Sequence, residues 1–499
     1  MKRALPVARP APVAVEALRD ALLEADYTHA GITAAIGDVA MEALHRSELV
    51  AAERATRGGS ALETLIRLFL LREPVDMIRA RAALPFALAW QLGLVEPVGG
   101  EVVATLDLRP YSVDDSTWWV VSDLSVEQTG APLRADHVLG VGGASVTLAQ
   151  LAPRNPVGDA LDIGTGCGIQ ALHLAQHARS VTATDISSRA LRLAAVTLAL
   201  NGAEAELIEG SLLEPVKGRR FDQIVSNPPF VVGSGDGGFT YRDSGLVGDA
   251  LSRTLIRALP GALMEDGTAQ ILANWMHVRG EPWTDRVGSW VNGLGCDAWV
   301  LQRDLQDPAG YVSLWLADAG SSSGAEHRAR YDSWLAWFEM QKVEAVGLGL
   351  VMLRNAGHAA PTVVIEEAHQ QIAPPLGPHV TSWFDRQDWL RQASDTTILD
   401  SSLRLAPDVT LEQVAQRDPD GGWAVLGQVL RQETGLRWRE DVDQLVATLV
   451  SGFDGEHSVL DLVTVLAATY QLEADISGVL QATARAVRHL ISRGFVAHE

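Results

Sequence analysis

The chain has 499 residues, and hydrophobic cores stop growing near about 250–300 residues, so more than one domain is expected. With 47% hydrophobic and 20% charged residues, the composition is that of a globular protein and excludes a disordered or fibrous one. The formal net charge is −22, and Lys2, Lys217 and Lys342 are the only lysines. This balance argues against nonspecific coating of nucleic acid through phosphate contacts, although a local basic groove is compatible with it.

The sequence carries no sign of a membrane segment or a metal cluster. No stretch of about eighteen uninterrupted apolar residues occurs, and prolines interrupt the first residues where a secretory signal needs a continuous apolar run. Cys167 and Cys296 are the only cysteines, too few for a disulfide framework or a zinc cluster. We therefore expect a cytoplasmic protein that binds neither a membrane nor a metal.

Residues 1–130 are predicted to form a helical module that ends in a hairpin or short sheet. Apolar residues recur at helical spacing in residues 15–25, 61–71 and 86–95. In residues 96–112 and 117–124, apolar and polar residues alternate, and glycines and prolines interrupt the pattern. Helices that close on a hairpin resemble a winged helix. The local arginines could bind nucleic acid, although such spacing is more often a solvated helix face; they are Arg67, Arg72, Arg79 and Arg81.

From residue 131 the pattern changes to strands that alternate with helices, which is typical of parallel βαβ units. Residues 297–305 and 345–356 could supply the last two strands, so this α/β domain is expected to span residues 131–372. A linker with three prolines then leads to residues 373–499, an accessory module of mostly helical character that also resembles a winged helix. In it, residues 403–414 are predicted to form one strand.

The first chemical motif is a glycine-rich loop that follows a predicted strand and opens a helix. It runs from Asp162 to Gly168, with glycines at 164, 166 and 168 and with Thr165 between the first two. Glycines allow a tight turn and a close approach of the backbone to a ligand. The spacing departs from the dinucleotide fingerprint, and the Asp162 carboxylate would repel a pyrophosphate. A ligand that carries a cationic amino acid is therefore favoured.

Asp185 ends the next predicted strand about twenty residues further on, where a carboxylate can accept hydrogen bonds from ribose hydroxyls. Ile186 would pack on an adenine face, and Ser211 and Leu212 would meet the adenine edge after the third strand. The alternative is that Asp185 only caps the following helix, a role that Ser187 could fill equally well.

The discriminating motif is Asn227-Pro228-Pro229-Phe230, at the end of the fourth predicted strand. Consecutive prolines fix the backbone and remove donors, so the carbonyls of the turn are left as acceptors. The Asn227 amide oxygen and the Pro228 carbonyl could hold a substrate amino group, and Phe230 would stack on the flat group that carries it. The alternative is a purely structural turn.

Together these motifs resemble the class I, Rossmann-like methyltransferases that carry Asn-Pro-Pro-aromatic. This branch includes release factor glutamine, ribosomal RNA guanine-N2 and N6-adenine methyltransferases. The resemblance covers roughly residues 131–280 and implies a seven-stranded domain that binds S-adenosylmethionine. It implies that the glycine loop, with Asp162, holds the cofactor, that Asp185 is the ribose ligand, and that residues 227–230 hold the substrate amine.

The family pattern leaves the acceptor open. Ser211 stands where the family often has Asp, which puts the adenine contact there in doubt. At the position of Phe230, several ribosomal RNA enzymes also carry Phe, whereas release factor enzymes usually carry Tyr. Residues 241–256, however, are similar to the segment that follows the motif in the release factor enzymes. Residues 134–145 occupy the place of a segment that folds over the cofactor in relatives, although a flexible linker would have similar glycines. His137 is interpreted as structural and Cys167 as a small residue in a tight loop.

The leading hypothesis is N-methylation of a planar amino or amide nitrogen on a macromolecule, either ribosomal or transfer RNA or a glutamine of a translation protein. An amide or ring-attached amine is a poor nucleophile, so positioning and charge stabilisation would drive the reaction. Two alternatives are a small-molecule methyltransferase and an inactive scaffold that binds S-adenosylmethionine and uses its flanks to bind partners.

Overall fold

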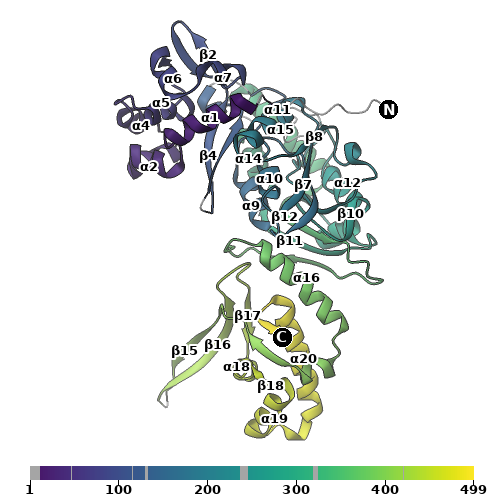
Figure 1. The fold of residues 1–499 in the computed structure, drawn as a ribbon. Helices are drawn as coiled ribbons and strands as arrows, with labels where there is room; N and C mark the ends of the chain where they lie inside the picture. Colours follow the sequence, from purple (N-terminus) through teal and green to yellow (C-terminus); the bar gives the residue numbers. More distant parts are fainter. Residues whose placement is uncertain are drawn as a thin grey trace. The chain divides into compact units, whose positions relative to one another are not determined.

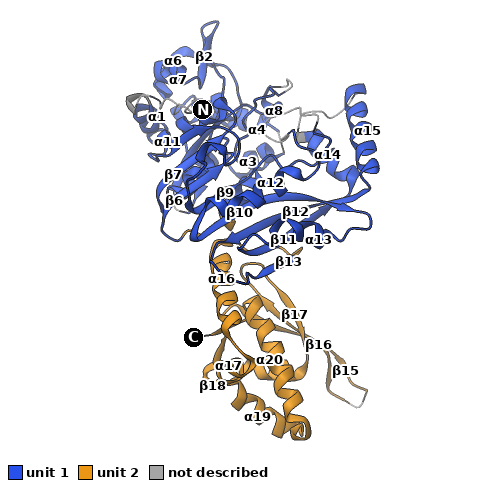
Figure 2. Cartoon of the chain, turned by 90° about the vertical axis from the view of Figure 1, so that its right-hand side faces the viewer, with its two compact units in different colours: residues 1–149, 155–367 blue, residues 150–154, 368–499 orange. Residues whose placement is uncertain are grey.

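The computed structural model describes residues 10, 12–46, 48–114, 116–129, 133–235, 245–318, 324–419 and 421–498. The chain divides into two compact units (Figure 2). The first contains residues 1–149 and 155–367, and the second contains residues 150–154 and 368–499. Among the described residues, no helix is both long and apolar enough to span a membrane.

The N-terminal part of the first unit contains short helices and two small sheets (Figure 1). The Ser60 and Glu63 side chains form a capping box at the start of α5. Shortly after the end of α7, Gly93 adopts a positive φ, the conformation that commonly ends a helix. The elements are α1 (Pro12–Glu24), α2 (His29–Ile36), α3 (Asp38–His45), α4 (Val50–Ala55), α5 (Ala61–Leu65), the π-helix η1 (Ile66–Leu70), β1 (Val75–Asp76), α6 (Met77–Ala83), α7 (Phe86–Gln91), β2 (Val95–Val98), β3 (Glu101–Ala104), β4 (Asp107–Val113), β5 (Ser116–Ser122) and α8 (Val126–Thr129).

The N-terminal region is helical, as expected, and two hairpins, β2–β3 and β4–β5, follow its helices. The turn between β2 and β3 is Gly99-Gly100, and both residues have the positive φ that such a two-residue turn requires. The second hairpin, β4–β5, is fixed against the central domain through Asn201, whose side chain accepts from the Trp119 amide and donates to the Trp119 carbonyl, each at 2.9 Å. The indole of Trp119 in turn donates to the Tyr27 carbonyl at 2.8 Å.

The central part of the first unit is an α/β domain. Its elements are α9 (Gly143–Leu151), β6 (Val157–Ile163), α10 (Ile169–Leu174), β7 (Ala178–Asp185), α11 (Ser188–Leu200), β8 (Glu206–Glu209), η2 (Glu214–Val216), β9 (Phe221–Ser226), α12 (Ala250–Ala258), η3 (Leu259–Ala262), β10 (Leu263–Val278), α13 (Trp283–Val291), β11 (Asp297–Gln306), α14 (Pro308–Asp318), α15 (Ala325–Met340), β12 (Val343–Arg354) and β13 (Val363–Glu367).

Within the described residues the central sheet has eight strands in the order β13-β11-β12-β10-β9-β6-β7-β8. Strands β8, β7, β6, β9 and β10 are parallel, and β12 lies antiparallel between β10 and β11. The Rossmann-like fold is as expected, with β11 and β12 near the predicted positions. The sheet has one strand more than the seven expected, because residues 363–367 pair in parallel with β11.

The parallel register gathers the chemical motifs at one edge of the sheet. Ile163, the last residue of β6, pairs with Thr184 on β7 and with Ser226 on β9. Asp185 at the end of β7 pairs with Glu209 at the end of β8. The segments that follow these four strands therefore meet at the carboxyl edge, where open α/β sheets bind ligands.

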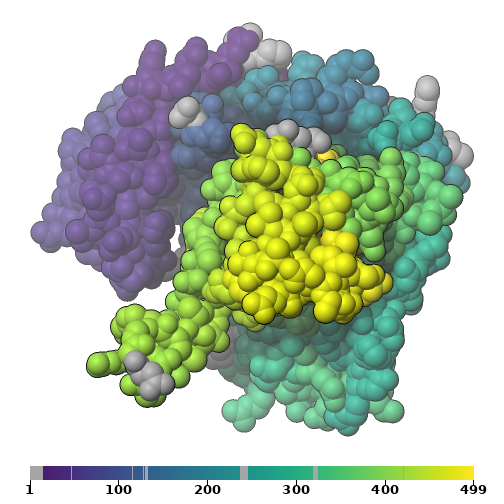
Figure 3. Space-filling model, turned by 90° about the horizontal axis from the view of Figure 1, so that it is seen from below, coloured from purple at the N-terminus to yellow at the C-terminus, as the bar shows by residue number. Residues whose placement is uncertain are grey.

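The second unit combines helices with two three-stranded sheets, β18-β14-β19 and β15-β16-β17. Its hairpin β15–β16 projects as a yellow-green arm from the rest of the unit (Figure 3). The elements are α16 (Gly377–Gln392), α17 (Asp395–Asp400), β14 (Ser402–Leu405), β15 (Val409–Arg417), β16 (Trp423–Gln432), β17 (Arg439–Val442), α18 (Gln444–Ser451), β18 (Asp454–Ser458), α19 (Val459–Tyr470), η4 (Glu473–Asp475), α20 (Ile476–Arg493) and β19 (Val496–His498).

The prediction of a single strand over residues 403–414 was wrong. The segment forms two strands that belong to different sheets, β14 and β15, and Pro407 lies between them. Proline has no amide hydrogen and cannot donate to a strand ladder, so the chain leaves one sheet and enters the next at this point.

Trp275 on β10 and Trp290 on α13 are tryptophans buried in the core of the central sheet. Trp275 determines which residues the neighbouring strand can carry. Its indole donates to Gln302 at 2.8 Å and stacks on Trp283 with the ring centroids 5.7 Å apart. The ring lies across Gly347 and Gly349 of the neighbouring strand β12, where an added Cβ would overlap with it. These glycines are therefore required by the tryptophan beside them.

We expect Gly349→Ala to lower the free energy of unfolding by about 1–3 kcal/mol or more, because the new methyl group overpacks the core against Trp275. Denaturant titration measures the change. Gly261→Ala is the control, since a Cβ there has nothing within 4 Å and the residue has no positive φ. Equal stability of the two variants would contradict this account of the core.

Candidate functional site

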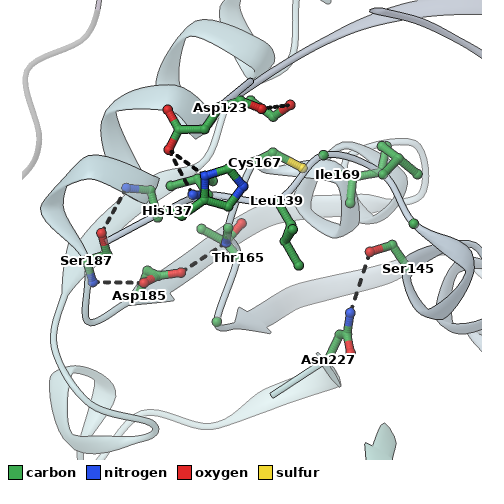
Figure 4. Close-up of a pocket in the computed structure, with 18 of the residues that line it drawn as sticks. Asp123, His137, Leu139, Ser145, Thr165, Cys167, Ile169, Asp185, Ser187 and Asn227 are labelled. Atoms are coloured by element: carbon green, nitrogen blue, oxygen red, sulfur yellow. Dashed lines mark hydrogen bonds and ion pairs between the residues drawn. The ribbon is translucent and has the colours of Figure 1, made fainter. Parts of the chain in front are cut away.

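A cavity of about 770 Å³ opens at the carboxyl edge of the sheet (Figure 4). It is lined by the glycine loop, by the ends of β7, β8 and β9, by residues 136–145, and by side chains of the N-terminal helices and hairpin. The predicted site residues that line it are Gly164, Thr165, Gly166, Asp185, Ile186, Ser211, Leu212, Asn227, Pro228 and Pro229. Asp162, Gly168 and Phe230 are not among the residues that line the cavity.

The glycine loop is shaped by three left-handed residues, with φ of 75°, 54° and 87° at Gly164, Gly166 and Gly168. An added Cβ at Gly166 would meet nothing within 4 Å, so the loop faces open space there. At Gly168 it would lie 3.1 Å from Ala194, so this glycine lets the loop approach α11 instead. A bulky ligand can therefore lie against the first part of the loop.

The end of β7 holds this loop in place. The carbonyl of Thr184 accepts hydrogen bonds from the amides of Gly164 and Thr165 at 2.8 and 3.0 Å. The Asp185 carboxylate accepts from the Gly166 amide at 3.0 Å and from the Ser187 amide at 2.8 Å. Ser187, and not Asp185, provides the side-chain cap of α11. Asp185 retains lone pairs for further donors, because an ionised carboxylate offers about four acceptor positions.

Asp162 lies underneath the loop and is 1% exposed. Burial raises the pKa of its carboxyl to about 7, and the negative charge of Asp185 adds to that shift. The nearby Thr165 hydroxyl opposes part of it, although neither side chain has a hydrogen bond of acceptable geometry among the described residues. Asp162 is thus a buried carboxyl near the end of β6 whose charge changes near neutral pH.

The side chains proposed for an adenine ring border the same cavity. Ile186 is 59% exposed at its wall, which is unusual for a large apolar side chain. The segment of Ser211 and Leu212 is tied back to β7, because the Gly210 amide donates to the Asp185 carbonyl at 2.9 Å. An apolar wall beside the Asp185 carboxylate suits a flat ring attached to a sugar.

The Asn227 turn is anchored on both sides. The Ser226 hydroxyl donates to the Ile163 carbonyl at 2.8 Å, which joins β9 to β6 below the turn. The Asn227 amide nitrogen points toward the Ser145 hydroxyl at 3.5 Å (Figure 4). Gln170 at the start of α10 donates to the Ser145 carbonyl at 2.7 Å. With the nitrogen turned toward Ser145, the Asn227 oxygen is left as the acceptor.

Phe230 is half-buried and packs edge-to-face on Trp315 of α14, with the ring centroids 6.3 Å apart. Two residues further on, the Val232 amide donates to the Tyr311 hydroxyl at 2.9 Å. The Trp334 indole of α15 donates to the Val232 carbonyl at 3.0 Å. Helices α14 and α15, which lie between β11 and β12 in the chain, thus contact the end of the turn and the residues that follow it. Residues 241–244 of the predicted release-factor-like segment lie outside the described residues.

A partly buried ion pair holds the segment that precedes β6, the first strand of the central domain in chain order. Asp123, after β5, forms a two-pronged pair with Arg189 of α11 and also accepts from the Val138 amide at 2.9 Å. His137 is 5% exposed, and its Nδ1 lies 3.8 Å from the same carboxylate. Residues 137–138 are thereby held against α11, beside the glycine loop (Figure 4).

Sequence reasoning missed several of these residues. Gln170 carried a usable signal, since it is a polar residue one position into the helix that follows the glycine loop. Asp123 and Arg189 are 66 positions apart, and nothing in their local pattern links them. Burial raises the pKa of the Cys167 thiol to about 11, so it stays protonated at neutral pH.

The four N-terminal arginines do not form one free basic surface. Arg67 forms an ion pair with Glu73 and donates to the Glu53 carbonyl at 3.2 Å. Arg72 donates to the Gln128 carbonyl at 2.6 Å. Arg79 and Arg81 are exposed on α6. Half of the set therefore has a structural role within the module.

We expect Asp162→Asn to change the pH dependence of stability. A carboxyl whose folded-state pKa is raised from about 4 to about 7 stabilises the fold below pH 4, and this contribution is lost as the pH rises toward 7. Asparagine is neutral throughout. The difference in melting temperature, variant minus wild type, should therefore be larger at pH 8 than at pH 5, by at least about 2 °C.

Thermal melts at the two pH values measure this difference. The exposed Glu265→Gln is the control and should give the same offset from the wild type at both. An offset for Asp162→Asn that is also independent of pH would contradict a raised pKa at this position.

Three family models match the chain. Residues 140–276 match the methyltransferase small domain, and residues 24–105 and 381–498 match two domains of unknown function, DUF7059 and DUF7782. Ribosomal RNA small subunit methyltransferase C of Cronobacter sakazakii is 35% identical over 162 residues, which are 32% of this chain and 43% of that protein. The Salmonella newport protein of the same name is 37% identical over 134 residues, 26% of this chain and 35% of that protein.

The matched segment thus spans less than half the length of these relatives. Among solved structures, the match to a methyltransferase from Pyrococcus furiosus covers 42% of this chain and 80% of that one, at 17% identity and a TM-score of 0.26. The match to the methyltransferase small domain covers residues 140–276, which contain the glycine loop, Asp185 and the Asn227 turn. This segment belongs to the methyltransferase small domain family, of the class I, S-adenosylmethionine-dependent type that carries Asn-Pro-Pro-Phe or Asn-Pro-Pro-Tyr.

Proposed function

We propose that this protein transfers a methyl group from S-adenosylmethionine to the amino nitrogen of a base in ribosomal RNA. The observation that carries the proposal is that the Asn227 turn, the glycine loop and Asp185 line one cavity. The candidate binding site for the methyl donor and the candidate binding site for an amino group therefore face the same cavity. The relatives named above, ribosomal RNA methyltransferases of the small subunit, favour RNA as the acceptor.

The described residues fit the cofactor. The open face of Gly164 and Gly166 gives room for the amino-acid part, and the buried hydroxyl of Thr165 has no hydrogen-bond partner within the described residues. The Asp185 carboxylate can accept from ribose hydroxyls, with Ile186 beside it for the adenine. When bound, S-adenosylmethionine supplies a methyl group attached to a positively charged sulfur.

The turn is suited to an amino group on a planar ring. Asn227 offers its amide oxygen, because its nitrogen is turned toward Ser145. Pro228 and Pro229 have no amide hydrogens, so the turn presents acceptors and no competing donors. Two acceptors fix both hydrogens of an NH₂ group and leave its lone pair directed away from them.

None of the side chains of the turn itself, Asn227 to Phe230, can act as a general base. The Cys167 thiol stays protonated, and the Asp185 carboxylate is bonded to two backbone amides. The residues would therefore act by holding the nitrogen in line with the methyl group, which is the entropic part of catalysis. The acceptors of the turn also stabilise the positive charge that develops on the nitrogen as the new bond forms. The proton then leaves to water.

Three other readings differ in their products. A glutamine of a translation protein is also a planar amide, so the turn alone does not distinguish it from a base. A small-molecule enzyme would label neither polymer. A scaffold would bind the cofactor without transfer.

We expect Gly166→Ala to weaken S-adenosylmethionine binding at least about tenfold by calorimetry. An alanine at φ 54° is strained, and its methyl group would enter the space in front of the loop. Gly261→Ala serves again as the control. Unchanged affinity in Gly166→Ala would show that the cofactor does not lie against this loop.

We expect Asn227→Ala to lower methyl transfer at least about a hundredfold while S-adenosylmethionine affinity changes less than about threefold, since loss of an oriented acceptor near the reacting atom costs about 2.7–4 kcal/mol. The assay follows labelled methyl groups into extract from cells that lack the protein, with separate nuclease and protease digestion. Asn292→Ala, at the end of α13, is the control.

Label released by nuclease supports the proposal. Label released only by protease would replace the RNA base with a protein side chain, and label on neither polymer would favour a small acceptor or a scaffold. A fully active Asn227→Ala would contradict the assigned role of the turn.

A further inference from the structure

The cavity has a second wall, built by the N-terminal module and not by the methyltransferase motifs. Four leucines from the N-terminal helices and their ends contribute its apolar part, and residues near the hairpin β4–β5 and α8 contribute its polar part. They are Leu44, Leu49, Leu70, Leu71, Asp107, Arg109, Ser125 and Gln128. The motifs that fit the cofactor use none of these side chains.

Irregular backbone shapes the apolar part of this wall. Residues 66–70 form a π-helix, in which the Leu71 amide bonds the Ile66 carbonyl at 3.0 Å. The next residue, Arg72, has φ 55°, an uncommon conformation for a residue other than glycine. Such turns cost energy and occur frequently at functional sites. Here the wide turn places Leu70 and Leu71 at the cavity.

The strained turn is tied to the polar part of the wall. Arg72 donates to the Gln128 backbone carbonyl at 2.6 Å, and the side-chain amide Nε2 of Gln128 donates to the Phe69 carbonyl at 3.4 Å. The apolar and polar parts of the wall are therefore one connected structure, anchored on α8. A packing role alone does not require a π-helix and a left-handed arginine at the same place.

Asp107, at the start of β4, is a buried carboxylate in the polar part of the wall. It is 7% exposed, and its Oδ2 accepts from the Arg109 Nε at 2.6 Å. Its Oδ1 is buried and has no hydrogen-bond partner among the described residues. Burial raises the pKa of this carboxyl, an effect that Arg109 and the nearby Gln128 amide partly oppose. A buried carboxylate oxygen without a donor is costly, so this atom requires one.

We propose that the N-terminal wall is the binding subsite for the acceptor ring, in which the Asp107 Oδ1 accepts a hydrogen bond from an N–H of the ring and the leucines pack on its face. This inference rests on the proposed function and identifies the N-terminal module as the part that recognises the acceptor. A planar nitrogen heterocycle combines an apolar face with N–H donors at its edge. A carboxylate selects a donor edge and rejects an acceptor edge.

The experiment measures transfer of labelled methyl groups to ribosomal RNA from cells that lack the protein, with the full chain. Asp107→Asn should raise the KM for this RNA at least about tenfold, the usual effect of losing a hydrogen bond to a charged group. Leu49→Ala, at a residue 37% exposed, should raise it about threefold. In both variants kcat and the affinity for S-adenosylmethionine should change less than about threefold. Glu101→Gln, an exposed carboxylate on β3, should change nothing.

The outcomes separate the two proposals. If the wild type labels RNA and both variants keep the wild-type KM, the acceptor subsite is wrong and the proposed function stands. If Asp107→Asn weakens S-adenosylmethionine binding as much as it raises KM, the wall serves the cofactor and the subsite is again overturned. If Asp107→Asn does not fold, Leu49→Ala decides by the same criterion. If the wild type transfers no label to RNA, both proposals fall together.

Discussion

The parallel pairing of β6 with β7 and β9 is the constraint on which the candidate site depends. It brings the ends of strands that are up to about sixty residues apart in the chain to one edge of the sheet. Short hydrogen bonds then convert proximity into a fixed shape: the Thr184 carbonyl and the Asp185 carboxylate hold the glycine loop, and the Ser226 hydroxyl holds β9 to β6. A shift of one residue in this register would turn the side chains of the shifted strand to the opposite face of the sheet.

Specific polar contacts join the N-terminal module to the central α/β domain. Asn201 clamps the backbone of Trp119, and Arg189 pairs with Asp123. The second contact is partly buried, and loss of one partner from such a pair usually costs several kcal/mol because the other charge stays uncompensated. The same α11 that packs on the glycine loop at Gly168 therefore also fixes the N-terminal wall of the cavity.

On the opposite side, α14 and α15 support the segment that follows the Asn227 turn. Their aromatic side chains form a buried cluster around Tyr311 and Phe338, and Tyr311 and Trp334 bond the backbone of Val232. A rigid turn needs such support, since an acceptor displaced by about 1 Å loses much of its value in positioning. The two helices thus fix the Asn227 turn, and the N-terminal module forms a separate wall of the same cavity.

The sequence by itself determined the α/β class, the alternation of strands and helices in the central domain and the residues of the three motifs, because strand periodicity, glycines and paired prolines are local properties. Local pattern also misled it at residues 403–414, where Pro407 divides one predicted strand between two sheets. Only the tertiary structure decided that Asp162 lies beneath the loop and not at the cavity, that Phe230 packs on Trp315, and that Asp107 and Asp123 face the site. Burial and contacts between residues 60 or more positions apart depend on how the elements pack, and no spacing along the chain encodes them.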